Sequence, residues 1–344
     1  MEPELLLAAA AALGLAVVFT PLRVPRASLL TWGLLGLAGM AAIVIAPSLD
    51  LAILILLVLA VLQARLTSNR EFVTRLRAPV LAIALLALGL AFERMQGPVV
   101  LDRFGAVGIV AGLVAAIGLL PYVHEFDPDE SVVASPIPWM AFIGPPLAAT
   151  VLSQANQVIP SDAGDAFGAM LIGLGLLNMI GGSLGSWRTQ NDASAWRYSF
   201  MADWGLAMCG FGLAIADGRS AALLMLFSIV LGRLPLYLWS RQALREKVPT
   251  DRPINLVVAA VLAGSAPFAG FPARVLLLRG ATQLYWPLAL VLAAGMLLWL
   301  PSSLRLGRSM GVPRGRQAVG VAIVLALNVL LGVYPQPLLT LAGL

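Results

Sequence analysis

The chain has 344 residues, of which 60% are hydrophobic and 11% are charged, and its mean hydropathy is +0.92. Soluble domains carry about 25% charged residues, so this composition excludes a soluble globular protein. The apolar residues form continuous runs instead of the alternating pattern of a membrane barrel. The sequence therefore predicts an all-α integral membrane protein surrounded by the lipid bilayer.

The charged residues comprise 22 Lys and Arg against 17 Asp and Glu, which gives a net charge of +5 and a pI near 10.0. Because the cations fall between apolar runs, membrane topology explains them better than a nucleic-acid partner does. Lys247 is the only lysine in the sequence. A lysine inside a membrane can release its proton whereas an arginine does not, so this inventory bears on any role in proton transport.

Successive segments along the chain are long and apolar enough to cross a bilayer. They are residues 4–20, 28–47, 50–64, 78–93, 103–122, 137–158, 165–186, 196–216, 220–240, 254–278, 284–303 and 317–341. We expect about twelve transmembrane helices in one polytopic membrane domain, residues 1–344. The first segment follows Glu2 and Glu4 instead of basic residues, which favours a retained helix over a signal peptide.

The positive charges predict the orientation of these helices. Sixteen of the 22 cations fall in the odd-numbered loops: Arg23, Arg26, Arg65, Arg70, Arg75, Arg77, Arg188, Arg197, Arg241, Arg245, Lys247, Arg252, Arg305, Arg308, Arg314 and Arg316. Cytoplasmic loops are enriched in Lys and Arg, so we expect these loops in the cytoplasm and both termini outside or in the periplasm. A bacterial inner (plasma) membrane fits this pattern.

One odd-numbered loop is acidic instead, with Glu125, Asp127, Asp129 and Glu130 beside His124. Oxygen ligands of this kind can bind a divalent cation, but the alternating register and the turn glycine of a calcium loop are missing. A solvated or partner-binding loop is the favoured interpretation. Tryptophans near the predicted helix ends suggest an aromatic belt at the membrane interfaces: Trp139, Trp187, Trp196, Trp204, Trp239, Trp286 and Trp299.

Helix-breaking residues gather at membrane depth around the fifth and tenth predicted helices. The expected positions of the breaks are Pro121, Pro145, Pro146, Pro267, Gly270 and Pro272. Proline lacks an amide donor, so the backbone there must be satisfied by other groups. Breaks five helices apart indicate an inverted-repeat transporter fold, although isolated prolines also merely kink membrane helices.

Four sequence blocks resemble the antiporter-like membrane subunits of respiratory complex I, of related membrane hydrogenases and of multisubunit cation/proton antiporters. The blocks are residues 120–142, 187–205, 266–274 (APFAGFPAR) and 330–339 (LLGVYPQPLL). The resemblance implies a leading helix at 4–20, inverted five-helix units at 28–158 and 165–303, and a trailing helix at 317–341. It also implies a chain shortened at its N-terminus, neighbouring membrane subunits as partners and no cofactor of its own.

The resemblance locates the family's proton carriers, and this sequence departs from most of them. An early glutamate falls near Leu59, the lysine before the first break falls at Ala116, and a further lysine falls near Leu147. A family histidine is replaced by Asp203, and the last lysine or glutamate by Arg274. Alanine and leucine carry no proton and arginine does not release one, so the path is expected to be degenerate.

The remaining candidates for an intramembrane ion path or ion pair are Asp203, Arg233, Arg274 and Arg197. A charge at this depth is costly and should be paired. Asp203 with Arg233 or Arg274 is interpreted as a fixed ion pair or as part of a surviving half-channel, and Arg197 as an interfacial anchor.

Three functions remain open. The favoured one is an antiporter-like subunit of a complex-I-related oxidoreductase assembly with a mainly structural or coupling role. The alternatives are active translocation through Asp203 with Arg233 and Arg274, and a standalone secondary transporter. No catalytic set, nucleophilic cysteine or phosphate loop is present, so we expect no catalytic chemistry, metal or cofactor in the chain itself.

Overall fold

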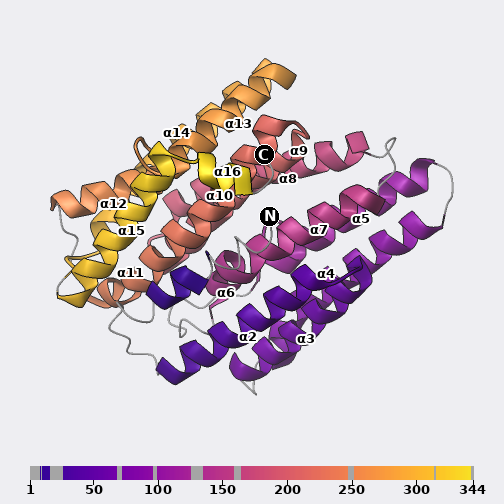
Figure 1. The fold of residues 1–344 in the computed structure, drawn as a ribbon, viewed down its shortest axis with the longest axis horizontal. Coiled ribbons are helices and arrows are strands. Elements are labelled where there is room, and N and C mark those ends of the chain that lie inside the picture. Colours follow the sequence, from indigo (N-terminus) through magenta and orange to yellow (C-terminus); the bar gives the residue numbers. More distant parts are fainter. Residues whose placement is uncertain are drawn as a thin grey trace. The chain divides into compact units, whose positions relative to one another are not determined.

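The computed structural model describes residues 8, 10–15, 26–67, 72–95, 99–124, 135–158, 164–246, 252–313 and 315–341. These ranges are almost entirely helical and contain no β-strand (Figure 1). Lys247, residues 125–130 and most of the first predicted helix lie outside them. The chain separates into two compact units, of which Ala27–Leu171 makes up nearly all of one and Ile172–Leu344 most of the other. We call these the first and the second unit.

The first unit consists of helices close to the predicted ranges. They are α2 (Arg26–Ile45), α3 (Leu49–Thr67), α4 (Phe72–Arg94), α5 (Val99–Ile117), α6 (Pro136–Pro138), the π-helix η1 (Trp139–Ile143) and α7 (Gly144–Val158). The last three follow one another without interruption. Helix α8 (Gly164–Arg188) begins in this unit and continues into the second.

The second unit contains the remaining helices. They are α9 (Asp192–Gly212), α10 (Ala216–Phe227), the π-helix η2 (Ser228–Arg233), α11 (Leu234–Glu246), α12 (Pro253–Ala263), α13 (Gly270–Leu284), α14 (Trp286–Ser309), α15 (Arg316–Val333) and α16 (Gln336–Leu341).

Six described helices are long and apolar enough to cross a membrane: Phe72–Arg94, Val100–Ile117, Pro136–Ala155, Gly164–Arg188, Ala216–Arg241 and Trp286–Ser309. Shorter apolar helices cover Leu30–Ile45, Pro253–Ala263 and Gln317–Val333. The protein is thus an all-α integral membrane protein, while twelve spans remain a prediction.

Glycines allow helices to approach closely within each unit. Helices α4 and α5 lie side by side in Figure 1, and a Cβ on Gly89 would be 2.6 Å from the backbone nitrogen of Ile109. In the second unit, a Cβ on Gly205 of α9 would meet the backbone of Gly175 and Met179 in α8. Small residues at such crossings are typical of membrane helices, because lipid offers no hydrophobic drive for association and close packing replaces it.

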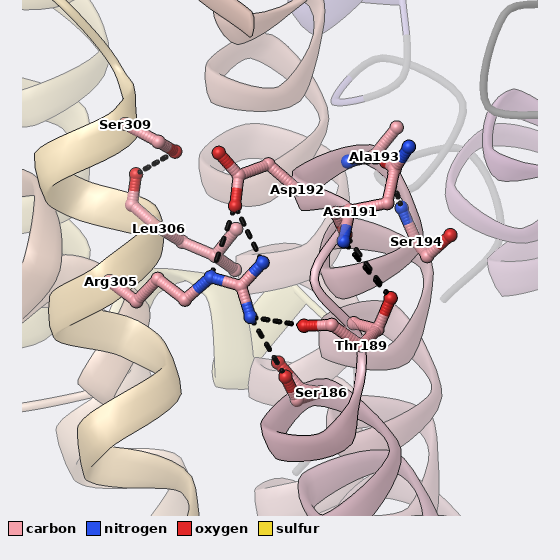
Figure 2. A network of polar contacts seen from close by, with 9 residues as sticks. All are labelled: Ser186, Thr189, Asn191, Asp192, Ala193, Ser194, Arg305, Leu306 and Ser309. Carbon is pink, nitrogen blue, oxygen red and sulfur yellow. Dashed lines mark hydrogen bonds and ion pairs between the residues drawn. The ribbon is translucent and has the colours of Figure 1, made fainter. Parts of the chain in front are cut away.

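A polar network joins the turn between α8 and α9 to α14 in the second unit (Figure 2). The Nε and Nη2 groups of Arg305 donate to Asp192 Oδ1 at 3.1 and 2.8 Å, and Nη1 donates to the carbonyl oxygens of Ser186 and Thr189. The guanidinium group therefore satisfies carbonyls at the end of α8 and pairs with a carboxylate at the start of α9. Nearby, Asn191 Oδ1 caps α9 by accepting from the amide of Ala193 at 2.8 Å.

The break between α12 and α13 is built by a left-handed glycine. Gly264 has φ +63°, its amide donates to Val261 O at 3.0 Å, and the amide of Ser265 donates to Ala260 O at 3.0 Å. This is the hydrogen-bond pattern of a Schellman motif, which ends a helix and satisfies two of its last carbonyls. A turn across the cis Ala266–Pro267 bond follows, in which the amide of Phe268 donates to Ser265 O at 3.0 Å.

The end of α5 repeats this geometry in the first unit. Gly118 has φ +87° and donates to Ala115 O at 3.2 Å, while Leu119 donates to Val114 O at 3.0 Å. The bond between Leu120 and Pro121 is also cis, and the amide of Tyr122 donates to Leu119 O at 2.7 Å. The same sequence pattern, Gly-x-x-Pro-aromatic, thus ends one helix in each unit.

Four of the expected break positions lie inside helices instead. Pro145 and Pro146 fall in the first turn of α7, directly after η1, where the wider π turn already departs from the α-helical hydrogen-bond pattern. Pro272 is in the first turn of α13, where an amide has no partner within the helix and its absence costs little. Gly270 is the first residue of α13, so the break itself covers Gly264 to Ala269.

Replacement of Gly264 tests this break. In Gly264→Ala, the left-handed backbone costs about 1–2 kcal/mol, and the new Cβ would lie 2.5 Å from Arg274 Cζ. We expect a lower thermal midpoint for the purified protein in detergent.

The matched control is Gly173→Ala, because that glycine is helical, exposed and has no atom within 4 Å of the added Cβ. This control should be neutral or stabilising by up to about 1 kcal/mol. Equal midpoints for Gly264→Ala and the wild type would contradict the described geometry.

Candidate functional site

The ends of broken helices need hydrogen-bond donors from elsewhere in the fold. In α12, the carbonyl of Leu262 accepts from Arg233 Nη2 at 2.8 Å and from Trp299 Nε1 at 2.8 Å. The last carbonyls of a helix have no partner within it, and lipid offers none. Arg233 and Trp299 therefore stabilise the end of α12.

The corresponding position in the first unit is satisfied in a similar way. Ala116 is placed relative to Gly118 as Leu262 is relative to Gly264, and its carbonyl accepts from Trp139 Nε1 at 2.7 Å. His124 Nε2 lies 3.0 Å from Ala115 O. Burial lowers the pKa of His124, against the opposing effect of the bond to Ala115. Because a carbonyl oxygen can only accept, Nε2 of His124 carries a proton and donates to Ala115 O.

Both π-helices present a donor to a broken helix. Trp139 is the first residue of η1, and Arg233 is the last residue of η2. In each case an amide donates five residues back, from Gly144 to Trp139 O and from Leu234 to Ile229 O. A π turn adds one residue to the helical repeat and rotates the side chains that follow, and such turns are frequent at functional sites.

Asp203, Arg233 and Arg274 meet next to the break in the second unit, and we call them the charge cluster. Asp203 Oδ2 forms an ion pair with Arg233 Nε, and Asp203 Oδ1 lies 3.8 Å from Arg274 Nη2. The side chains of Asp203 and Arg233 are each 3% exposed, and that of Arg274 is 10% exposed. Arg233 also donates from Nη1 to Ser199 Oγ. Asp203 is thus bonded closely to Arg233 and more loosely to Arg274.

Each member of the cluster is held by a different helix. Asp203 lies on α9, Arg233 ends η2, and Arg274 follows the break at the start of α13, where its guanidinium group packs against Gly264. The Arg233 guanidinium also lies 5.3 Å from the centre of the Trp299 ring, a cation–π distance. Two guanidinium groups face one carboxylate, so removal of the carboxylate would leave buried positive charge without compensation.

Other predicted site residues lie apart from the cluster. Arg197 is half-buried on α9, and its guanidinium lies 5.1 Å from the centre of the Tyr198 ring. Leu59, Ala116 and Leu147, where the family resemblance would place proton carriers, are all buried in the first unit. Neither an acid nor a base occupies these three positions.

The tryptophans were only partly predicted. Trp187 and Trp286 are exposed by 47% and 64%, as an interfacial belt requires, whereas Trp139 and Trp299 are each 2% exposed. The belt interpretation is therefore wrong for Trp139 and Trp299, whose indole groups donate to the ends of broken helices. It is also wrong for Trp196, Trp204 and Trp239, which are 0%, 1% and 6% exposed. The repeated Gly-x-x-Pro-aromatic pattern is the sequence signal that marks these helix ends. No sequence pattern indicated that Ser199 would accept a hydrogen bond from Arg233.

Comparison with solved structures identifies the class of fold. A chain of the membrane-bound sulfane sulfur reductase, an archaeal respiratory membrane complex, matches 96% of this chain and 64% of its own length, with a TM-score of 0.74 and 16% identity. A chain of the Mrp complex from Dietzia sp. DQ12-45-1b matches 97% and 43%, with a TM-score of 0.76 and 14% identity. A chain of respiratory complex I from Thermus thermophilus matches 98% and 84%, with a TM-score of 0.70 and 20% identity. The protein has the antiporter-like membrane subunit fold.

Sequence comparison agrees with this class. The chain is 24% identical over 286 residues to NADH-quinone oxidoreductase subunit M of Mycobacterium tuberculosis, and the alignment covers 72% of this chain and 51% of the relative. The chain therefore spans about half the length of the curated relatives it matches. No family model matches the sequence. The resemblance to antiporter-like subunits is confirmed by these relatives and solved structures.

Two matched substitutions test the role of the indoles. Trp139→Phe removes the donor to Ala116 O and should cost about 1–3 kcal/mol of unfolding free energy, as expected for a buried acceptor that loses its partner. Trp299→Phe should cost less, because Arg233 still donates to Leu262 O.

Denaturant-induced unfolding of both variants in detergent measures the difference. A larger loss for Trp299→Phe than for Trp139→Phe would contradict the proposed sharing of Leu262 O between two donors.

Proposed function

We propose that the chain is an antiporter-like membrane subunit of a complex-I-related proton-translocating oxidoreductase assembly, in which its own proton path is interrupted. Its role is then to couple or support neighbouring membrane subunits. The names of its relatives support this proposal, because they are a subunit of NADH-quinone oxidoreductase and chains of multisubunit membrane complexes. The partners are other membrane subunits and the surrounding lipid.

The charge cluster is the observation that carries the proposal. Arginine keeps its proton at any physiological pH, so Arg233 and Arg274 do not act as carriers. Both are committed to Asp203, and Arg233 also supports the end of α12. Together with the buried Leu59, Ala116 and Leu147, this favours a structural ion cluster over a relay of titrating groups.

The proposal includes twelve spans, two inverted five-helix units and termini outside a bacterial inner membrane. The matching turns at Gly118 and Gly264 support the repeat, because one such turn falls in each unit. Inverted repeats with discontinuous helices near the bilayer midplane are common in secondary transporters.

The second candidate function is active ion translocation through Asp203. It is favoured by one observation, a buried carboxylate next to a broken helix, since intramembrane acids are common in proton relays. The two candidates differ in what they expect when the charge of Asp203 is removed.

Asp203→Asn in the native assembly separates them. We expect a several-fold loss of assembled complex in the membrane, because Arg233 and Arg274 lose their counter-charge. Proton pumping per assembled complex, measured in vesicles and normalised to the complex resolved on native gels, should be unchanged.

Asp217→Asn is the matched control, because Asp217 pairs with the exposed Arg279 in the same unit and such exposed pairs contribute about 0–1 kcal/mol. Normal assembly of Asp203→Asn with abolished pumping would favour active translocation and overturn the structural proposal.

A further inference from the structure

The charge cluster contains two buried polar atoms that its ion pairs leave without a hydrogen bond. One is the acceptor Oδ1 of Asp203, and the other is the donor Nε of Arg274. Neither atom is hydrogen-bonded to any residue that the structure describes. The two side chains are only 3% and 10% exposed, so bulk water does not satisfy them either. Buried polar atoms are nearly always hydrogen-bonded, and these two therefore require a partner.

The two atoms face the same narrow region. Asp203 Oδ1 lies 3.8 Å from Arg274 Nη2, which is longer than the range of about 2.7–3.2 Å for a direct N–H···O hydrogen bond. The Nε–H and one N–H of Nη2 project from the same edge of the planar guanidinium group. The free donor of Arg274 is therefore directed toward the side on which the free acceptor of Asp203 lies.

Other contacts hold the carboxylate and the guanidinium group at this separation. Asp203 is bonded through its second oxygen, Oδ2, to Arg233 Nε. The guanidinium group of Arg274 packs against Gly264, where an added Cβ would lie 2.8 Å from Nε. Gly264 itself is fixed by the left-handed turn that ends α12. The gap between Asp203 and Arg274 is thus set by groups on either side of it.

A ligand in this gap must donate to a carboxylate oxygen and accept from a guanidinium N–H at the same time. Chloride or another anion would accept from Arg274 but would be repelled by Asp203 at this distance. A cation would be attracted to Asp203 but repelled by Arg274. Water both donates and accepts, and a polar contact longer than 3.5 Å is of the length that a water molecule bridges.

We propose that the charge cluster has a binding site for one water molecule, which accepts from Nε and Nη2 of Arg274 and donates to Asp203 Oδ1. With hydrogen bonds of about 2.8 Å, one water reaches both Nη2 and Oδ1 across the 3.8 Å gap. About three hydrogen bonds are typical of a buried water. The site depends on the geometry of the cluster and holds for either candidate function.

The water gives the two arginines different roles. Arg233 bonds directly to Asp203 and to the carbonyl of Leu262, so it belongs to the fixed support of α12. Arg274 reaches the same carboxylate through a molecule that can exchange. Both oxygens of Asp203 and the Nε groups of both arginines are then hydrogen-bonded.

Solid-state NMR of the full-length chain in lipid bilayers, with isotope-labelled arginine, tests the site. We expect a cross-peak between water and the Nε–H of Arg274. The Nε–H of Arg233 should show none, because it bonds directly to Asp203 Oδ2. Arg233 is the matched control, since it presents the same donor to the same carboxylate and is also buried. Each resonance is assigned by its loss in Arg274→Lys or Arg233→Lys.

Cross-peaks of equal strength for both arginines would indicate general hydration of the cluster and would overturn a single bridging site. The lack of a cross-peak for Arg274 would overturn it as well.

If either variant fails to fold, a cryo-EM map of the wild-type protein that resolves ordered water decides. Density within hydrogen-bonding distance of both Asp203 Oδ1 and Arg274 Nε supports the site. A direct bond between these two groups, an empty gap, or density that contacts only one of them contradicts it.

Discussion

Broken helices inside a membrane leave backbone carbonyls that neither the helix nor lipid can satisfy, and the arrangement of both units follows from this constraint. The left-handed Gly118 and Gly264 turn the chain and satisfy two carbonyls each. Trp139 and Trp299 satisfy the next carbonyl through their indoles. The two units thus solve the same problem with the same turn and the same kind of donor.

The units differ in the charge placed beside the turn. In the first unit His124 supplies the extra donor, and the positions where the family resemblance would place carriers are apolar. In the second unit the extra donor is the charged Arg233, which requires a counter-charge at this depth. Asp203 provides that counter-charge and also faces Arg274, so the acid is part of the support of the broken helix. Arg233 supports the end of α12 and needs Asp203 as its counter-charge, so the charge cluster stabilises the broken helix more directly than it serves proton transfer.

Much of this arrangement was predictable from the sequence. Apolar runs predicted most of the described helices, with ends up to about six residues from those observed, because length and hydropathy dominate helix placement in a bilayer. The runs at 254–278 and 317–341 each form two helices instead of one. Charge pairing at depth predicted a pair of Asp203 with Arg233 or Arg274. The π turns were not predictable, because they depend on the packing of Trp139 and Arg233 against other helices. Pro145 and Pro146 were expected to mark a break. The helix continues through them, because a π turn directly precedes them.

A double-mutant cycle between Asp203 and Arg233 tests the central claim most directly, with unfolding free energy in detergent as the measurement. Asp203→Asn and Arg233→Gln should each cost up to about 3–5 kcal/mol, because the first leaves two buried guanidinium groups without their carboxylate and the second leaves Asp203 with only its looser contact to Arg274. The double variant should cost clearly less than the two together, because it leaves no unpaired member of this bond. Effects that add to within about 0.5 kcal/mol would contradict a structural ion pair at the broken helix.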